Sequence, residues 1–319
     1  KKSIMALRYQ LIETLINRVK RPNFWFELAI VTLFLLSFAP VSYWFAENTL
    51  SETRILHSLI TLSLAIILLY RFESPTIKNA LEINTQCQKS LKFAFSLLVL
   101  FIGTKTCLHI FQLDSFILNI IYSLSIVSAM VLALSSFVFF VFGTEISRIA
   151  YSSAITLILF LFLSLFMIQV DWPLRALAAQ WSVYLIEFLG QSVDFFLANK
   201  HQNSPDLIIQ FKGRNFNVAS ECNGFGIILN TALISLLLSV YKRHSFLNGF
   251  TNIIAALFIG FTFNVLRIIS IIFIAPYAFQ YYDFLHEMLG TIYYWGAFFM
   301  TWYLLKGPLE KTVREPKLP

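Results

Sequence analysis

Long apolar runs dominate this chain, and several are close to the length that crosses a lipid bilayer. A transmembrane helix needs about 20 mostly apolar residues. Eight segments meet that description, near residues 24–45, 54–70, 92–111, 115–140, 149–170, 224–241, 249–274 and 288–305. With 58% hydrophobic residues and 34 phenylalanines, the composition lies outside the range of soluble globular proteins. The sequence therefore predicts an all-α polytopic membrane protein with about eight transmembrane helices, in a single membrane domain over 1–319.

The basic residues are scattered between the apolar runs, so the net charge of +7 indicates membrane topology and not a nucleic-acid surface. If the N-terminus lies inside, most Lys and Arg fall in cytoplasmic segments, as the positive-inside rule requires. We therefore expect both termini on the cytoplasmic side of the cytoplasmic (inner) membrane. The first apolar run starts only after about twenty residues and no small-residue cleavage site follows, so we expect no removable signal peptide.

This topology places residues 171–223 outside, between five spans in 1–170 and three spans in 224–305. Within 172–198, the polar residues Gln180, Glu187, Gln191 and Asp194 share one helical stripe, which predicts a helix lying in the membrane interface. A ninth, poorly apolar span is the alternative. The following "LIIQFKGRNFNVAS" predicts a short extracytoplasmic β-hairpin that turns at Gly213.

The three cysteines, Cys87, Cys107 and Cys222, show neither paired nor CxxC spacing, so we expect no disulfide framework, no metal site and no cofactor. Cys87 and Cys107 are interpreted as small apolar fillers. Cys222 precedes a helix whose free N–H groups and dipole would favour a thiolate, whereas the neighbouring Glu221 would oppose it. A nucleophile and a filler therefore both remain open for Cys222.

Two further residues are unusual for their positions. Arg267 lies among apolar residues, so it either faces a cavity or extends to the headgroups, and Asn264 one turn earlier could help it bind a carbonyl, a carboxylate or an oxyanion. His286, in "YYDFLHEMLG", is expected in the loop that opens the last span, where Asp283 or Glu287 could orient it as an acid-base group. The predicted topology brings Cys222, Arg267 and His286 to one membrane level.

The order of these motifs resembles that of the exosortase and archaeosortase family of multispanning membrane cysteine transpeptidases. "CNGFG" follows the hairpin, "NVLR" lies in the next helix, and a histidine precedes the last span; the likeness covers roughly 180–305. It implies that Cys222 is the nucleophile, that Arg267 and His286 complete the catalytic site, and that Gly224 and Asn264 are supporting positions. Asn223 stands where the family usually has serine or alanine, so we expect an active variant or a specialised subfamily.

The resemblance also implies the substrates. They would be exported proteins that carry a C-terminal motif, a transmembrane helix and a basic tail, presented at the extracytoplasmic side of the bilayer. Cleavage through a thioester on Cys222 would release them or transfer them to an acceptor. Two alternatives stay open: a small-solute transporter in which Arg267 and Lys105 line an anion path, and an assembly scaffold without catalysis. No nucleic acid is expected as a partner.

Overall fold

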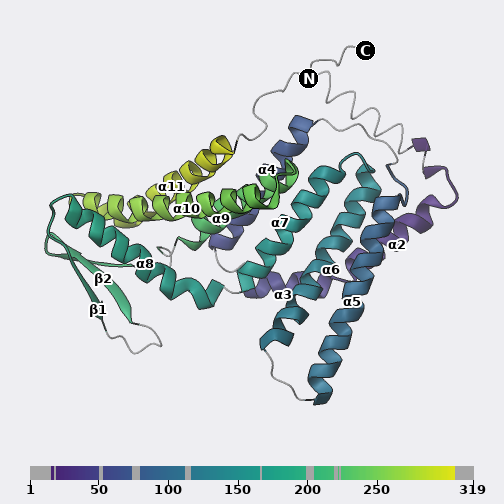
Figure 1. The fold of residues 1–319 in the computed structure, drawn as a ribbon, viewed down its shortest axis with the longest axis horizontal. Helices are drawn as coiled ribbons and strands as arrows, with labels where there is room; N and C mark the ends of the chain where they lie inside the picture. Colours follow the sequence, from purple (N-terminus) through teal and green to yellow (C-terminus); the bar gives the residue numbers. More distant parts are fainter. Residues whose placement is uncertain are drawn as a thin grey trace, which may run out of the picture. The chain divides into compact units, whose positions relative to one another are not determined.

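The computed structural model describes residues 16–17, 19–49, 53–73, 80–111, 116–165, 167–198, 205–218, 222 and 224–305 of the 319-residue chain. Figure 1 shows their fold, which is mostly helical. The chain forms two compact units, one of Lys1–Ser51 with Ile66–Ser164 and one of Glu52–Ala65 with Leu165–Pro319. The single membrane domain expected from the sequence stays a prediction.

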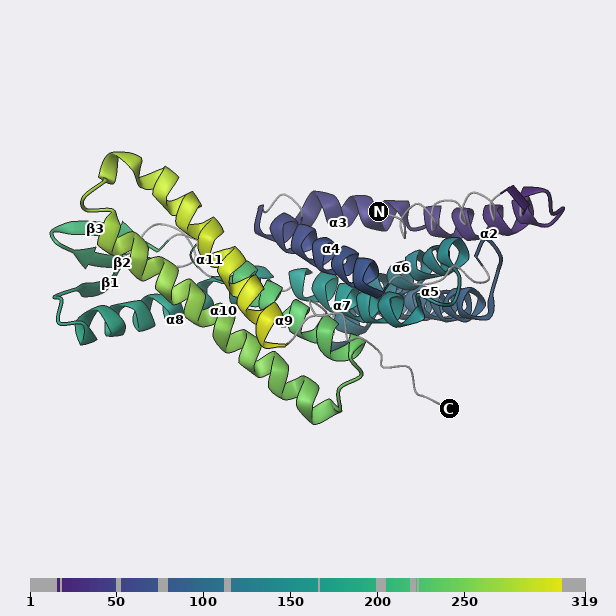
Figure 2. The same cartoon turned by 90° about the horizontal axis from the view of Figure 1, so that it is seen from above.

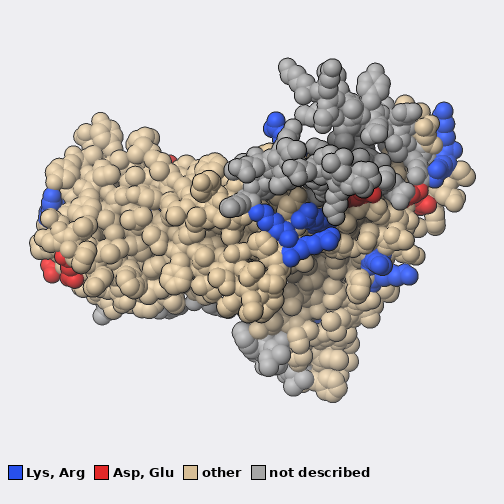
Figure 3. Space-filling model, turned by 45° about the horizontal axis from the view of Figure 1, so that its top comes forward, with Lys and Arg blue, Asp and Glu red and all other residues tan. Residues whose placement is uncertain are grey.

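Among the residues that the structure describes, five segments are long and apolar enough to span a membrane: Phe24–Glu47, Thr85–Phe111, Ile120–Phe142, Ser147–Leu165 and Phe246–Ile274. Two expected spans correspond to shorter apolar helices, Leu56–Phe72 and Phe225–Tyr241. The last expected span coincides with α11 (Tyr282–Leu304), which is not among the five. The polytopic helical class is therefore supported, and the number of eight spans stays a prediction. On the face drawn in Figure 3, the part that contains α10 and α11 is almost free of charged side chains, as a lipid-facing surface requires.

The first unit contains α2 (Phe24–Leu36), α3 (Ala39–Thr49), α5 (Thr85–Phe111), α6 (Phe116–Phe142) and α7 (Ser147–Leu165), with the second half of α4 (Thr53–Glu73). Helices α5 and α6 lie side by side (Figure 1). Cys87 is fully buried in a core that includes Phe139 and Phe140, whereas Cys107 is exposed on α5. Cys87 thus packs as the apolar filler that the sequence indicates.

The second unit begins with the first half of α4 and continues with α8 (Met167–Phe188). The expected fifth span, 149–170, overlaps α7 and the start of α8, and its bounds stay a prediction. Helix α8 ends before Gly190, which has φ +77°. The Gly190 N–H bonds the Glu187 carbonyl and the Gln191 N–H bonds the Ile186 carbonyl, the paired bonds of a Schellman motif. The helix predicted to continue to residue 198 is therefore wrong over its last ten residues.

Three strands follow α8 in the described part of the chain: β1 (Asp194–Ala198), β2 (Asp206–Phe211) and β3 (Arg214–Asn217). They form one antiparallel sheet in the order β1-β2-β3. The β2–β3 turn consists of Lys212 and Gly213, whose φ values of 52° and 74° suit a two-residue hairpin. The hairpin lies where the sequence indicates it, whereas β1 was not predicted. The location of the hairpin outside the membrane stays a prediction.

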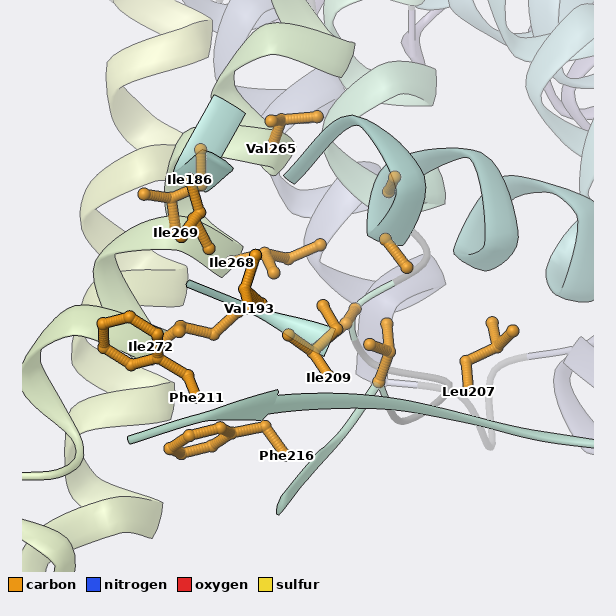
Figure 4. Packing of buried hydrophobic residues seen from close by; sticks show 14 of the residues in the cluster. Ile186, Val193, Leu207, Ile209, Phe211, Phe216, Val265, Ile268, Ile269 and Ile272 are labelled. Carbon is orange, nitrogen blue, oxygen red and sulfur yellow. The ribbon is translucent and has the colours of Figure 1, made fainter. Parts of the chain in front are cut away.

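The sheet packs on α10 (Phe246–Ile274) through alternate residues of β2. Leu207, Ile209 and Phe211 are buried in one cluster with Ile268 and Ile272 of α10, and Figure 4 shows Phe211 and Ile209 near these two isoleucines. Burying one such side chain stabilises the fold by roughly 1.5–3 kcal/mol. The sheet, α8 and the end of α10 therefore lie together at one end of the unit (Figure 2).

Helix α9 (Phe225–Tyr241) packs very closely on α10. A Cβ added at Gly260 of α10 would lie 2.6 Å from Thr231 Oγ1 and 2.8 Å from Ile228 Cα, both on α9. Only glycine allows this approach. Helix α11, preceded by the 3-10 turn Phe279–Tyr281, crosses both helices (Figure 2).

Candidate functional site

Cys222 lies between the end of β3 and the start of α9, and only 6% of its surface is exposed. Two contacts hold Val218, the last described residue before Cys222. The Val218 N–H bonds the Leu207 carbonyl at 2.8 Å, and Arg175 Nη1 lies 3.5 Å from the Val218 carbonyl oxygen. Arg175 also forms a 3.0 Å ion pair with Asp171, one turn earlier on α8. This supporting role of Arg175 was not predictable from the sequence, because Val218 is distant in the chain.

Gly224 and Asn264 hold the turn that follows Cys222. Gly224 has φ +71°, and a Cβ there would lie 2.5 Å from Asn264 Nδ2 and 2.8 Å from Asn264 Cβ. Asn264 is fully buried, and its Nδ2 donates a 3.0 Å hydrogen bond to the Cys222 carbonyl. Asn264 thus supports the backbone of Cys222, and its expected role beside Arg267 in binding a ligand carbonyl stays a prediction. The supporting position Asn223, like Glu221, lies outside the described residues.

His286 meets both other candidate residues at one nitrogen. Its Nε2 lies 3.4 Å from Cys222 Sγ and 3.2 Å from Arg267 Nη2. His286 belongs to α11, so the expectation of a loop position is wrong; a 3-10 turn leads directly into the helix and makes His286 part of it. The Tyr282 ring stacks near the imidazole, with centroids 6.2 Å apart. That Asp283 or Glu287 orients the ring stays a prediction.

The position of the proton on the His286 ring follows from which of the three side chains can donate a hydrogen bond. A guanidinium only donates, so Nε2 accepts from Arg267 and the neutral ring carries its proton on Nδ1. Nε2 has one lone pair, and the Cys222 thiol points at the same atom. The thiol and the guanidinium therefore compete for one acceptor, and the transfer of the thiol proton to Nε2 would release the guanidinium.

Arg267 lies near the C-terminal end of α10 with only 8% of its surface exposed. It lies against Gly290 of α11, where a Cβ would be in van der Waals contact with Cζ, Nε and Nη2 at 3.4 Å. The guanidinium therefore lies against α11 beside His286 and does not extend to the surface. The other cation of the transporter alternative, Lys105, is exposed on α5 in the first unit.

Arg267 and His286 line a cavity of about 540 Å³. Its lining comes from four helices of the second unit and includes two glycines beside the Cys222 turn, the reactive side chains Arg267 and His286, and a polar wall on α4 and α11. The lining residues are His57, Ile60, Thr61, Gly224, Gly226, Ile227, Arg267, His286, Glu287, Gly290, Thr291, Tyr294 and Trp295. A peptide segment could enter it, because ligand pockets commonly enclose about 300–1,000 Å³.

The model of the transmembrane exosortase family (Exosortase_EpsH) matches residues 49–303. The chain belongs to the exosortase family. The match starts well before residue 180, so the likeness extends over more of this exosortase than its motifs alone indicated. Exosortases are membrane proteins connected with protein sorting that act on membrane-associated proteins. Comparison of this exosortase with curated proteins and with solved structures found no match.

Proposed function

We propose that the protein is a membrane cysteine peptidase and transpeptidase in which Cys222 is the nucleophile, His286 the acid-base group and Arg267 the oxyanion-binding cation. One observation carries the proposal: Cys222 Sγ and Arg267 Nη2 both lie within 3.4 Å of His286 Nε2. A nucleophile within hydrogen-bond reach of a base is the arrangement that covalent catalysis needs. A transport function gives this contact no role.

The first half-reaction starts when the Cys222 thiol proton moves to His286 Nε2. The thiolate then attacks the carbonyl carbon of the scissile peptide bond, and the electron pair moves to the carbonyl oxygen. Arg267, released from Nε2 by the proton transfer, donates its N–H groups to that oxyanion. The tetrahedral intermediate collapses, the C–N bond breaks, and the imidazolium gives its proton to the leaving amine. A thioester on Cys222 and a free C-terminal fragment result.

The second half-reaction returns the site to its starting state. An acceptor amine or water attacks the thioester carbonyl while His286 takes its proton. The C–S bond breaks, and the thiolate recovers a proton from the imidazolium. An amine acceptor makes the reaction a transfer, and water makes it a hydrolysis.

We propose that the substrates are exported proteins with a C-terminal motif, a transmembrane helix and a basic tail, cleaved at the extracytoplasmic side of the inner membrane. A substrate anchored in the same bilayer reaches the site at a fixed depth, which reduces the orientational entropy lost on binding. The largely apolar outer surface of α10 and α11 is compatible with this approach (Figure 3).

The test is Cys222→Ala in cells that express an exported protein with such a C-terminal end. Cleavage, followed as the loss of the C-terminal segment on an immunoblot, should stop. Cys87→Ala and Cys107→Ala are the matched controls and should cleave normally, because one thiol packs in a separate core and the other is exposed on α5. Equal cleavage by all three variants would exclude Cys222 as the nucleophile.

A further inference from the structure

One wall of the cavity takes no part in the proposed chemistry. It consists of His57, Ile60 and Thr61 on α4 with Tyr294 and Trp295 on α11. We infer that Tyr294, oriented by Thr61, is a substrate-binding residue that accepts a hydrogen bond from a backbone N–H of the polypeptide substrate. The inference rests on the proposed function and names a recognition point for it.

The direction of the hydrogen bonds at Tyr294 follows from a proton count. The Thr61 hydroxyl donates to the His57 carbonyl at 2.8 Å. A hydroxyl has one proton. In the 2.8 Å contact between Thr61 Oγ1 and the Tyr294 hydroxyl, the donor is therefore Tyr294. Ser58, the second hydroxyl that bonds Tyr294, has its own acceptor in the Gly226 carbonyl at 3.4 Å. With the Thr61 and Ser58 protons directed to carbonyls, the Tyr294 proton is held on the α4 side, and the lone pair left toward the cavity calls for a donor on the ligand.

Helix α11 sets this acceptor in line with the reactive residues. His286, Gly290 and Tyr294 are spaced four residues apart, so they share one face of the helix. The Arg267 guanidinium lies against Gly290, and Tyr294 is one turn farther, about 6 Å along the axis. The cavity thus presents two groups about one helical turn apart. The Arg267 guanidinium can only donate hydrogen bonds, and the Tyr294 oxygen can accept one from a ligand.

This pair matches a peptide backbone better than it matches a small anion. An extended peptide presents carbonyl acceptors and N–H donors alternately, with a residue rise of about 3.3 Å. A carbonyl near Arg267 and an N–H near Tyr294 can therefore belong to neighbouring residues of one substrate. An anion held by Arg267 would meet the lone pairs of Tyr294, which makes this wall unfavourable for an anion path.

The test uses a bromoacetyl-trialanine amide and versions of it that are N-methylated at one backbone nitrogen each. The Cys222 thiolate displaces bromide from the bromoacetyl carbon, and mass spectrometry of the Cys222 peptide gives the labelling rate. Below saturation, one N-methylated probe should react about 3- to 10-fold more slowly than the parent, the loss expected for one hydrogen bond. Tyr294→Phe should slow the parent probe to the same rate and remove the difference between the probes.

Two controls separate this effect from a general disturbance. Tyr293→Phe removes a neighbouring hydroxyl that bonds Ser270 Oγ at 2.6 Å, and it should keep the probe selectivity. Thr61→Ser should also keep it, whereas the double variant Ser58→Ala/Thr61→Val, which removes both hydroxyl partners of Tyr294, should weaken it by turning the Tyr294 proton toward the cavity.

The outcomes distinguish the inference from the proposed function. If Cys222 reacts with the parent probe no faster than Cys107, the assignment of Cys222 as the nucleophile is refuted, and the assignment of Tyr294 as a substrate-binding residue is refuted with it. If Cys222 reacts rapidly but Tyr294→Phe shows the same probe selectivity as the wild type, the recognition point alone is refuted. Uniform rates for all probes on the wild-type protein would refute it equally.

Discussion

The contact between Gly224 and Asn264 can be tested with two glycines of nearly equal conformation. Gly213 has φ +74° and Gly224 has φ +71°. Alanine at either position must adopt a left-handed conformation, which costs about 1–2 kcal/mol. A Cβ at Gly213 would meet no described atom within 4 Å, whereas a Cβ at Gly224 would overlap Asn264. Gly213→Ala is therefore the control for backbone strain alone.

Gly224→Ala must also displace the Asn264 amide from the buried Cys222 carbonyl. Leaving a buried acceptor unsatisfied costs about 1–3 kcal/mol, so Gly224→Ala should destabilise the protein by about 2–5 kcal/mol in total. The excess over Gly213→Ala should lower the unfolding midpoint by about 2–12 °C. Thermal unfolding in detergent, followed by tryptophan fluorescence, measures this difference. Alkylation of Cys222 should also change in Gly224→Ala and not in Gly213→Ala.

Asn264→Gly supplies the second half of a double-mutant cycle. It removes the side chain that a Cβ at Gly224 would overlap, so in this background Gly224→Ala should cost no more than Gly213→Ala does in the wild type. Equal midpoints for the two single alanine variants, with unchanged alkylation of Cys222, would refute the reasoning. So would fully additive effects of Gly224→Ala and Asn264→Gly.

Two further predictions concern the charge at the site and the membrane topology. Arg267→Lys keeps the cation but loses the planar group that lies against Gly290 and reaches His286, so it should cleave substrate almost as poorly as Arg267→Ala at matched abundance; near-normal cleavage would show that charge alone suffices. Tags inserted at Gly213 and at the C-terminus should be protease-accessible from opposite sides of the membrane, the first from outside; the same side for both would contradict the proposed location of the site.

The sequence predicted those parts of the fold that depend on local pattern. Apolar runs indicated the helices, and the positive-φ Gly213 between two strand-like segments indicated the β2–β3 turn. Strand β1 was missed because "DFFLA" has no period-2 alternation and becomes a strand by pairing with β2. Gly190 itself was the available sequence signal, because a glycine often follows the last residue of a helix and allows the Schellman motif that ends α8 here.

The candidate site was predictable in its residues but not in its contacts. Cys222, Arg267 and His286 do lie together, as motif order and topology indicated. That two donors share His286 Nε2, and that the guanidinium lies against Gly290, depends on how α10 and α11 pack. The contact of the Asn264 amide with the Cys222 carbonyl was not predicted, because the sequence does not reveal which carbonyl an amide meets across 42 residues of chain.

The glycine contact between α9 and α10 determines how the three reactive residues can move. With Gly260 packed on Ile228 and Thr231, sliding of these helices would produce clashes at once. We therefore expect Cys222, whose carbonyl is bonded by Asn264 of α10, to move together with Arg267 of the same helix. His286 is carried by α11, which follows α10 through a short 3-10 turn. Any motion that separates the base from the thiol to admit a substrate must then be a displacement of α11, hinged at Phe279–Tyr281, and not a parting of the thiol from the cation.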